Sequence, residues 1–133
     1  MRILVVEDLY ANQQNLQGIL AQYGKVDLAE DGPETIRLFN QAHQEGRPYG
    51  LVFLALAPPT IAEYQAARHI RAFEEAQGIV QRAILVIATK ALFTQDILAI
   101  FQRGADLYLE KPFSSEQVEN YMKECGIPKK KRP

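Results

Sequence analysis

Four polar side chains of this sequence stand at the ends of expected β-strands. Glu7 and Asp8 end the first apolar run of the chain, whereas Thr89 and Lys111 follow two later runs. Adjacent carboxylates suit Mg²⁺, a hard ion that takes oxygen ligands. A hydroxyl and an ammonium suit a phosphoryl group, the first by hydrogen bonding and the second by charge. If the fold brings these strand ends together, the four residues predict a site for phosphoryl chemistry.

Another strand end carries no reactive group. The apolar run at residues 51–54 leads directly into Ala55, and Pro58 and Pro59 follow. A short apolar run bounded by turn signals predicts a strand buried on both faces, as in parallel sheets covered by helices. In such open sheets, ligands bind outside the carboxyl ends of the strands. Position 55 therefore lies where chemistry is expected, and it holds a methyl group.

Strand and helix patterns alternate five times along the chain. Strict alternation predicts a parallel sheet with helices on both faces, joined by right-handed crossovers. For five strands the first expectation is the doubly wound order 2-1-3-4-5. The expected strands are residues 2–7, 25–29, 50–55, 83–88 and 106–109, and the expected helices are about 11–22, 32–45, 60–76, 94–103 and 115–125.

Local signals mark the ends of several helices. Asp31 is expected to cap the second helix, with Glu34 reaching back in a capping box. Ser114 and Gln117 have the same spacing at the last helix. Gly24 is expected to end the first helix in a left-handed conformation.

The chain length of 133 residues and the composition indicate one soluble domain, which we place at 1–126, followed by a basic tail at 127–133. Four of the fifteen basic residues lie in 129–132, so the body carries eleven basic and sixteen acidic side chains, which argues against a nucleic-acid groove. No apolar run approaches a membrane span. The single Cys125 suits a reducing compartment, and a cytoplasmic protein is expected. His43 and His69 show no metal-ligand spacing and are taken as surface residues.

Taken together, the strand-end residues resemble those of a response-regulator receiver domain, over residues 1–126. The motifs are the acidic pair at 7–8, the run ending at Ala55 with Pro59 after it, Ala88-Thr89, and the segment 104–112, Gly-Ala-Asp-Leu-Tyr-Leu-Glu-Lys-Pro. The last motif is the most specific, because it combines a glycine, an aromatic residue and a Lys-Pro pair at the end of a fifth strand. The resemblance implies an α/β, flavodoxin-like fold with the five-stranded parallel sheet and five helices described above.

The resemblance also implies roles for individual residues. Asp8, with Glu7, would hold Mg²⁺, and Lys111 would contact the phosphoryl group. Thr89 would be the hydroxyl that follows this group, and Tyr108 the aromatic side chain that swings inward with it. Without the resemblance, the acidic pair would be expected as solvated loop charges and Tyr108 as a packing residue.

The sequence departs from the receiver pattern at the centre of the site. In receivers the position of Ala55 is an aspartate, which accepts phosphate from a histidine kinase and also binds the metal. An acyl phosphate requires a carboxylate nucleophile, and neither Leu54 nor Leu56 supplies one. We therefore expect no catalytic residue and no enzyme activity. Mg²⁺ binding is expected to be weak or absent, since affinity follows the charge of the ligands.

The first hypothesis is a stand-alone receiver-like protein of a two-component or phosphorelay pathway, not phosphorylatable and acting by contact. Its partners would be a histidine kinase, a phosphotransfer protein or a downstream target, or a second copy in a homodimer, with no DNA-binding domain and no membrane. The contact face would be the helix at 94–103, the fifth strand and the last helix, with candidate residues Gln95, Gln102, Tyr108 and Gln117.

Two alternatives remain. The pocket could retain Mg²⁺ or an anion at Glu7, Asp8, Thr89 and Lys111, and serve as a ligand sensor or a residual phosphoryl-transfer site. Alternatively, the chain could be an ordinary phosphorylated response regulator altered at position 55.

Overall fold

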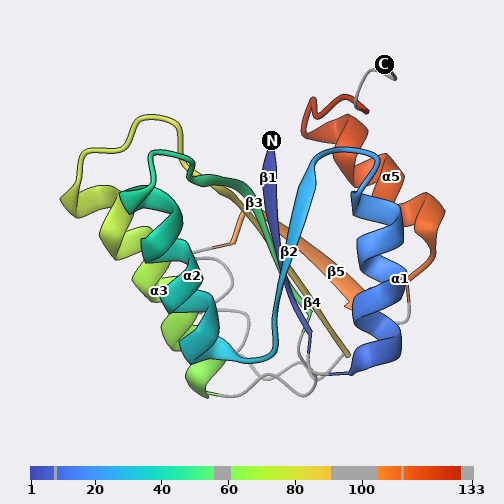
Figure 1. Ribbon diagram of the computed structural model, residues 1–133. Coiled ribbons are helices and arrows are strands. Elements are labelled where there is room, and N and C mark those ends of the chain that lie inside the picture. Colours follow the sequence, from blue (N-terminus) through green and yellow to red (C-terminus); the bar gives the residue numbers. More distant parts are fainter. Residues whose placement is uncertain (8, 56–60, 91–104, 112, 130–133) are drawn as a thin grey trace.

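Five parallel strands form one sheet in the order β2-β1-β3-β4-β5, as predicted (Figure 1). Every neighbouring pair is parallel, so each connection crosses over the sheet. The strands are β1 (Arg2–Val6), β2 (Lys25–Ala29), β3 (Tyr49–Leu54), β4 (Ile84–Lys90) and β5 (Leu107–Lys111).

This computed structural model describes residues 1–7, 9–55, 61–90, 105–111 and 113–129. For residues 61–64, 89, 90, 108, 110 and 111 it describes the backbone alone. The expected helix at 94–103 lies outside the described residues.

Helices cover both faces of the sheet, which confirms the doubly wound architecture (Figure 1). One face carries α1 (Tyr10–Leu20) and α5 (Ser115–Glu124), and the other carries α2 (Gly32–Gln44) and α3 (Ile61–Ala76). Within the described residues, no helix is long and apolar enough to cross a membrane.

Alternate residues of the central strands supply two separate cores. On β1, Ile3 and Val5 pack under α1 and α5, whereas Leu4 and Val6 pack under α2 and α3. All four are fully buried. Because burial of one such side chain contributes about 1.5–3 kcal/mol, the unbroken apolar runs specify a strand covered on both faces.

The packed chain continues past the expected boundary at residue 126. Ile127 is 6% exposed and belongs to the core under α1 and α5, although we placed it in the tail. The neighbouring tail residue Lys129 lies 3.8 Å from the carboxylate of Glu119 on α5. The beginning of the basic segment is therefore attached to the last helix.

Two strands are longer at their carboxyl ends than the apolar runs predict. Thr89 and Lys90 continue β4, and they pair with Glu110 and Lys111 of β5. The sequence pattern ended both strands at the last apolar residue. The ladder continues because its hydrogen bonds come from the backbone, which does not require apolar side chains.

The capping predictions have different outcomes. The Asp31 carboxylate accepts a hydrogen bond from the Glu34 amide at 2.9 Å, and Ser114 and Gln117 form the predicted capping box. Gly24, by contrast, is not left-handed, since the described glycines with positive φ are Gly46, Gly78 and Gly126. A Cβ at Gly24 would lie 2.2 Å from the carbonyl oxygen of Met1, so the residue is required by close backbone contact.

The two histidines are half-buried between α2 and α3, so taking them as surface residues was wrong. The His43 ring lies 4.9 Å from the Phe39 ring and 4.8 Å from the Phe73 ring, between centroids. His69 Nε2 lies 2.9 Å from the Asn40 side-chain oxygen. Both imidazoles serve packing between the two helices.

Candidate functional site

Glu7 and Ala55 lie next to each other where β1 and β3 end. Val6 and Leu54 are partners in the β1–β3 register, and the Ala55 amide donates to the Val6 carbonyl at 2.8 Å. On the other side, the Glu7 amide donates to the Ala29 carbonyl at the end of β2 at 3.0 Å. The switch point of the sheet, where the strand order reverses, therefore presents Glu7 and Ala55.

The Glu7 side chain is fully buried and helps to begin α1. Its Oε1 accepts a hydrogen bond from the Leu9 amide at 3.2 Å, and the Gln13 side-chain amide donates to the Glu7 carbonyl oxygen. A carboxylate at a helix N-terminus is favourable because the helix dipole is positive there. Glu7 thus joins the end of β1 to the first turn of α1.

Ala55 is also fully buried, and its methyl group belongs to the core under α1 and α5. A methyl group offers neither a nucleophile nor a metal ligand. At the place where the sheet geometry favours a ligand, Ala55 therefore contributes a packed methyl group and a backbone hydrogen bond to Val6.

The other expected site residues are described in part. Thr89 and Lys111 are placed by their backbones near or at the carboxyl ends of β4 and β5, and Tyr108 pairs with Ile87 within the sheet. Their side chains lie outside the described atoms. Asp8, Gln95 and Gln102 lie outside the described residues, so these roles remain predictions.

Gln117, the remaining candidate for partner contact, is exposed at the start of α5. Its side-chain oxygen accepts a hydrogen bond from the Ser114 amide at 2.8 Å. The side chain therefore has a capping role in addition to any role in recognition.

The donor set described at this edge is small for a divalent ion. Within the described residues, no group of three His, Cys, Asp or Glu side chains comes together as a metal site. Of the two acidic residues expected to hold the ion, Glu7 is the one that is described, and one of its oxygens already accepts the Leu9 amide. Mg²⁺ prefers six oxygen ligands in octahedral geometry. The described residues alone do not fit a dedicated magnesium site.

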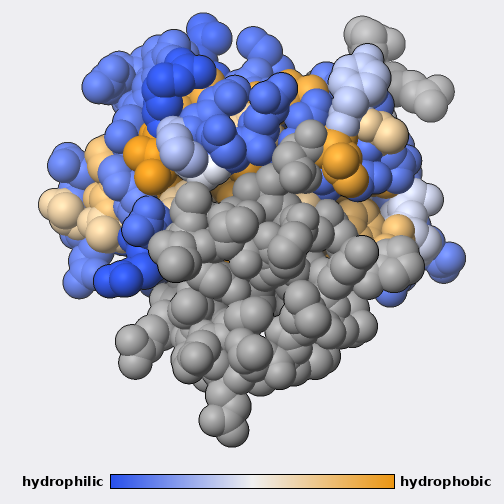
Figure 2. Space-filling model, turned by 90° about the horizontal axis from the view of Figure 1, so that it is seen from below, coloured by the Kyte–Doolittle hydropathy of each residue, from blue (hydrophilic) through white to orange (hydrophobic). Residues whose placement is uncertain are grey.

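Figure 2 views the carboxyl-terminal edge of the sheet from below. Around this edge the described surface is mainly hydrophilic, with hydrophobic residues in small separate groups. The described part of this view shows no wide apolar patch of the kind that binds a lipid surface or a large apolar ligand.

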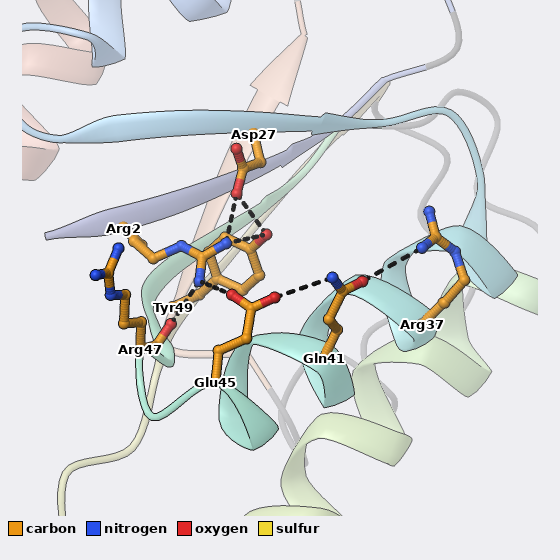
Figure 3. Close-up of polar contacts among 7 residues, drawn as sticks. All are labelled: Arg2, Asp27, Arg37, Gln41, Glu45, Arg47 and Tyr49. Atoms are coloured by element: carbon orange, nitrogen blue, oxygen red, sulfur yellow. Dashed lines mark hydrogen bonds and ion pairs between the residues drawn. The ribbon is translucent and has the colours of Figure 1, made fainter.

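At the opposite end of the sheet the structure contains a polar cluster that sequence analysis missed (Figure 3). The Arg2 guanidinium donates to Asp27 at 2.9 Å and to the Arg47 carbonyl at 3.0 Å, and lies 3.3 Å from Glu45. It also lies 4.8 Å from the ring centroid of Tyr49. The cluster ties β1 and β2 to the end of α2.

Inside this cluster, the hydroxyl of Tyr49 donates to Asp27 at 2.7 Å. Burial tends to raise the pKa of Asp27, but the hydrogen bonds from Tyr49 and Arg2 outweigh it and lower the pKa. Burial, followed by the bond to Asp27, raises the pKa of Tyr49. The pattern of an arginine, an aspartate and a tyrosine on three different strands gave no local signal in the sequence.

A second polar cluster attaches α3 to the sheet. The Glu74 side chain is 1% exposed; it accepts from Arg71 at 2.7 Å and from the Ala83 amide at 2.6 Å. Arg71 also contacts Asp106 at 2.6 Å, and Asp106 accepts from the Leu85 amide at 2.8 Å. Asp106, which we assigned to the fifth strand, instead precedes β5 and connects it with β4 and α3.

Comparisons with known proteins agree with this geometry. Residues 3–123 match the family model described as the response regulator receiver domain. A hybrid signal transduction histidine kinase of Dictyostelium discoideum is 29% identical over 126 residues, which are 94% of this chain and 7% of the kinase. Response regulator MprA of Mycobacterium avium is 31% identical over 119 residues, which are 89% of this chain and 47% of that protein. The chain spans less than half the length of these relatives.

Solved structures show the same architecture. The receiver domain of a sensor histidine kinase from Pseudomonas aeruginosa, with a magnesium ion in its active-site cleft, is 27% identical with a TM-score of 0.71, covering 92% of this chain and 94% of that chain. A second solved structure is the receiver domain of a Saccharomyces cerevisiae response regulator, crystallised with a histidine phosphotransfer signalling protein. It is 27% identical with a TM-score of 0.73, and the match covers 93% of this chain and 87% of that chain.

Proposed function

The chain belongs to the response regulator receiver domain family, and we propose that it serves two-component or phosphorelay signalling without being phosphorylated at the end of β3. In this proposal the protein acts by contact with other signalling proteins. Cys125 is free and half-buried, which supports a location in the reducing cytoplasm.

Ala55 carries this proposal. The residue follows β3 at the switch point of the sheet, beside Glu7, and is fully buried. Formation of an acyl phosphate requires a carboxylate oxygen to attack phosphorus. The methyl group of Ala55 has no lone pair, so the reaction has no nucleophile at this position.

The test is intact mass spectrometry after incubation with Mg²⁺ and acetyl phosphate. Three proteins are compared: the unmodified chain, Ala55→Asp, and Ala55→Asn as a control of similar volume without a carboxylate. Circular dichroism confirms that each variant is folded. We expect no phosphoryl adduct on the unmodified chain or on Ala55→Asn.

The outcome for Ala55→Asp defines the rest of the site. An adduct on this variant alone would mean that the site is sound except for one carboxylate, as in an ordinary regulator altered at position 55. No adduct on any protein would mean that the site is degenerate beyond this position. An adduct on the unmodified chain would contradict the proposal, because another residue would then be the acceptor.

Contact with a phosphotransfer protein or a histidine kinase is the partner class that the comparisons support. The yeast relative was crystallised with a histidine phosphotransfer protein, and the Dictyostelium relative is a hybrid histidine kinase. For this chain, the proposed face comprises β5 and α5 with the segment before β5. Titration of a labelled candidate partner, with Gln117→Ala compared with Ser115→Ala, would test α5, and equal affinity for both variants would move the contact elsewhere.

A magnesium sensor is the second candidate, because the Pseudomonas relative holds magnesium in its active-site cleft. In this chain Glu7 and Asp8 would supply the carboxylates, with Thr89 and Lys111 available to a bound anion. Calorimetric titration with Mg²⁺ tests this candidate. Absence of heat up to about 10 mM Mg²⁺ would remove this candidate.

A further inference from the structure

Helix α1 differs from the other described helices in its charge. From Leu9 to Gly24 the sequence contains no Asp, Glu, Lys, Arg or His, whereas α2, α3 and α5 all carry acidic and basic residues. The inner side of α1 is occupied, since Gln13, Leu16, Ile19 and Leu20 are buried. Its outer side is therefore a neutral, amide-rich surface in a chain that is 23% charged.

Three exposed residues of α1 lie on one stripe of the helix. Tyr10, Gln14 and Gly18 are spaced by four residues, so they follow one another along the same face. Tyr10 is 75% exposed, a large exposure for an aromatic side chain, and Leu9 beside it is 60% exposed. At the other end of the stripe, a Cβ built on Gly18 would find nothing within 4 Å, so the backbone there is open to close approach.

We propose that this α1 face, defined by Tyr10, Gln14 and Gly18, binds the same face of a second copy of the chain. Tyr10 and Gly18 are equally distant from Gln14 along the stripe. In an antiparallel arrangement about a two-fold axis at Gln14, each tyrosine ring therefore lies over the glycine of the other copy. Such a self-complementary patch is what a two-fold interface requires.

The chemistry of the face matches a copy of itself. Each Asn or Gln amide both donates and accepts hydrogen bonds, so Gln14 can pair with Gln14 of a second copy. The full chain carries fifteen basic and sixteen acidic side chains, so most other surfaces present charges that need complementary charges in any contact between two copies. Among the described helices, α1 is the one that carries no charged side chain, so a contact between two α1 helices places no like charges of these helices together. A strongly charged partner, by contrast, would find no complementary charge on this helix.

The size of the face predicts a weak dimer. An α-helix of 11 residues is about 16 Å long, which is short for the roughly 800 Å² that each partner contributes to a stable interface. We expect a dissociation constant on the order of 100 μM. The inference concerns α1 and holds whether or not position 55 accepts phosphate.

Sedimentation equilibrium of the full chain, up to about 1 mM, tests the proposal with three variants. Gln14→Glu is nearly isosteric and places two carboxylates at the axis, and Gln77→Glu makes the same change at an exposed position beyond α3. Gly18→Gln fills the space above residue 18 in which the Tyr10 ring of the second copy would lie. Because glutamine is a better helix former than glycine, loss of association in this variant cannot be ascribed to unfolding.

We expect the mass of the unmodified chain to rise from 15.0 kDa toward twice that value with concentration. Gln77→Glu should behave in the same way, whereas Gln14→Glu and Gly18→Gln should weaken association by about tenfold or more. A chain that remains monomeric throughout would overturn the proposal. Equal association of Gln14→Glu and Gln77→Glu would also overturn it, since the interface would then lie on another face.

Discussion

Glu74 is a buried carboxylate whose negative charge is fully engaged. It accepts one bond from Arg71 and one from the Ala83 amide just before β4, while Arg71 also donates to the Ala83 carbonyl at 2.9 Å. Taking an ion pair out of water is costly, so such a pair contributes little net stability by itself. Removal of Glu74 is costly for a different reason, because it takes the acceptor from the buried Ala83 amide and part of the negative charge from around Arg71.

We therefore predict that Glu74→Ala lowers the free energy of unfolding by about 3–5 kcal/mol. The change removes the acceptor of the Ala83 amide and one acidic partner of Arg71, which keeps its contact with Asp106. Glu75→Ala is the matched control, because Glu75 is the next residue along the chain and is exposed. Urea denaturation at neutral pH gives both values. A loss for Glu74→Ala no larger than that of the control would contradict the assigned role.

Asp27 provides a prediction of pH dependence. Its pKa is lowered in the folded protein, because the hydrogen bonds from Tyr49 and Arg2 outweigh the effect of burial. A lowered folded pKa contributes stability that is present above the unfolded value, near 4, and is lost as the pH falls through the folded value. The free energy of unfolding should therefore fall on acidification below about pH 4.

The variant Asp27→Asn should reduce this slope, since the amide keeps an acceptor oxygen but does not titrate. Tyr49→Phe removes the 2.7 Å hydrogen bond to Asp27 and keeps the ring, so an intermediate slope is expected. Denaturation with urea at a series of pH values from about 3 to 6 measures all three slopes. Identical slopes would show that Asp27 does not couple folding to protons.

At the scale of helices and strands, features that depend on residues close in sequence were predicted, whereas features that depend on distant residues were missed. The strand at 51–54 and the box of Ser114 and Gln117 were predicted because apolar runs and caps act within a few residues. The role of Gly24 was missed, because its constraint comes from Met1, which is brought close by the β1–β2 pairing. The longer ends of β4 and β5 depend on each other in the same way.

Two glycines, one within α1 and one between α1 and β2, are expected to respond in opposite ways to substitution by alanine. Gly18→Ala should raise the free energy of unfolding by about 1 kcal/mol, because alanine is the better helix former and the site is open. Gly24→Ala should lower it by about 1–3 kcal/mol. Its methyl group would overlap the Met1 carbonyl, which accepts a 2.9 Å hydrogen bond from the Lys25 amide.

Urea denaturation at micromolar concentration, where the chain is monomeric, compares the two variants. The comparison is internally controlled, since both changes add one methyl group to a glycine near the same helix. Effects of the same sign would contradict the close contact between Gly24 and Met1.

For the whole molecule, the strand order allowed residues distant in sequence to be placed at one edge of the sheet. Glu7 and Ala55 are indeed adjacent there, because the switch point follows from topology alone. The burial of Glu7 and its contact with Leu9 could not be predicted, since they depend on how α1 leaves the sheet. The cluster of Arg2, Asp27 and Tyr49 depends on the register of three strands and was missed for the same reason.

Magnesium linkage tests how the missing carboxylate at position 55 affects the molecule as a whole. A ligand that binds the folded state alone raises the free energy of unfolding by RT ln(1 + [L]/Kd), about 2.7 kcal/mol at a hundred times Kd. The Ala55 side chain supplies no oxygen ligand, so Mg²⁺ at about 10 mM should leave the free energy of unfolding of the unmodified chain unchanged.

With Ala55→Asp, the same Mg²⁺ addition should raise the free energy of unfolding, because Glu7 would gain a second carboxylate across the 2.8 Å backbone contact between β1 and β3. Each protein is compared with itself in the presence and absence of the ion, so the cost of burying a new carboxylate cancels. Ala55→Asn has nearly the same volume without the charge and should respond as the unmodified chain does. An equal rise in the free energy of unfolding of all three proteins would mean that magnesium binds away from position 55. The missing carboxylate would then not account for weak magnesium binding.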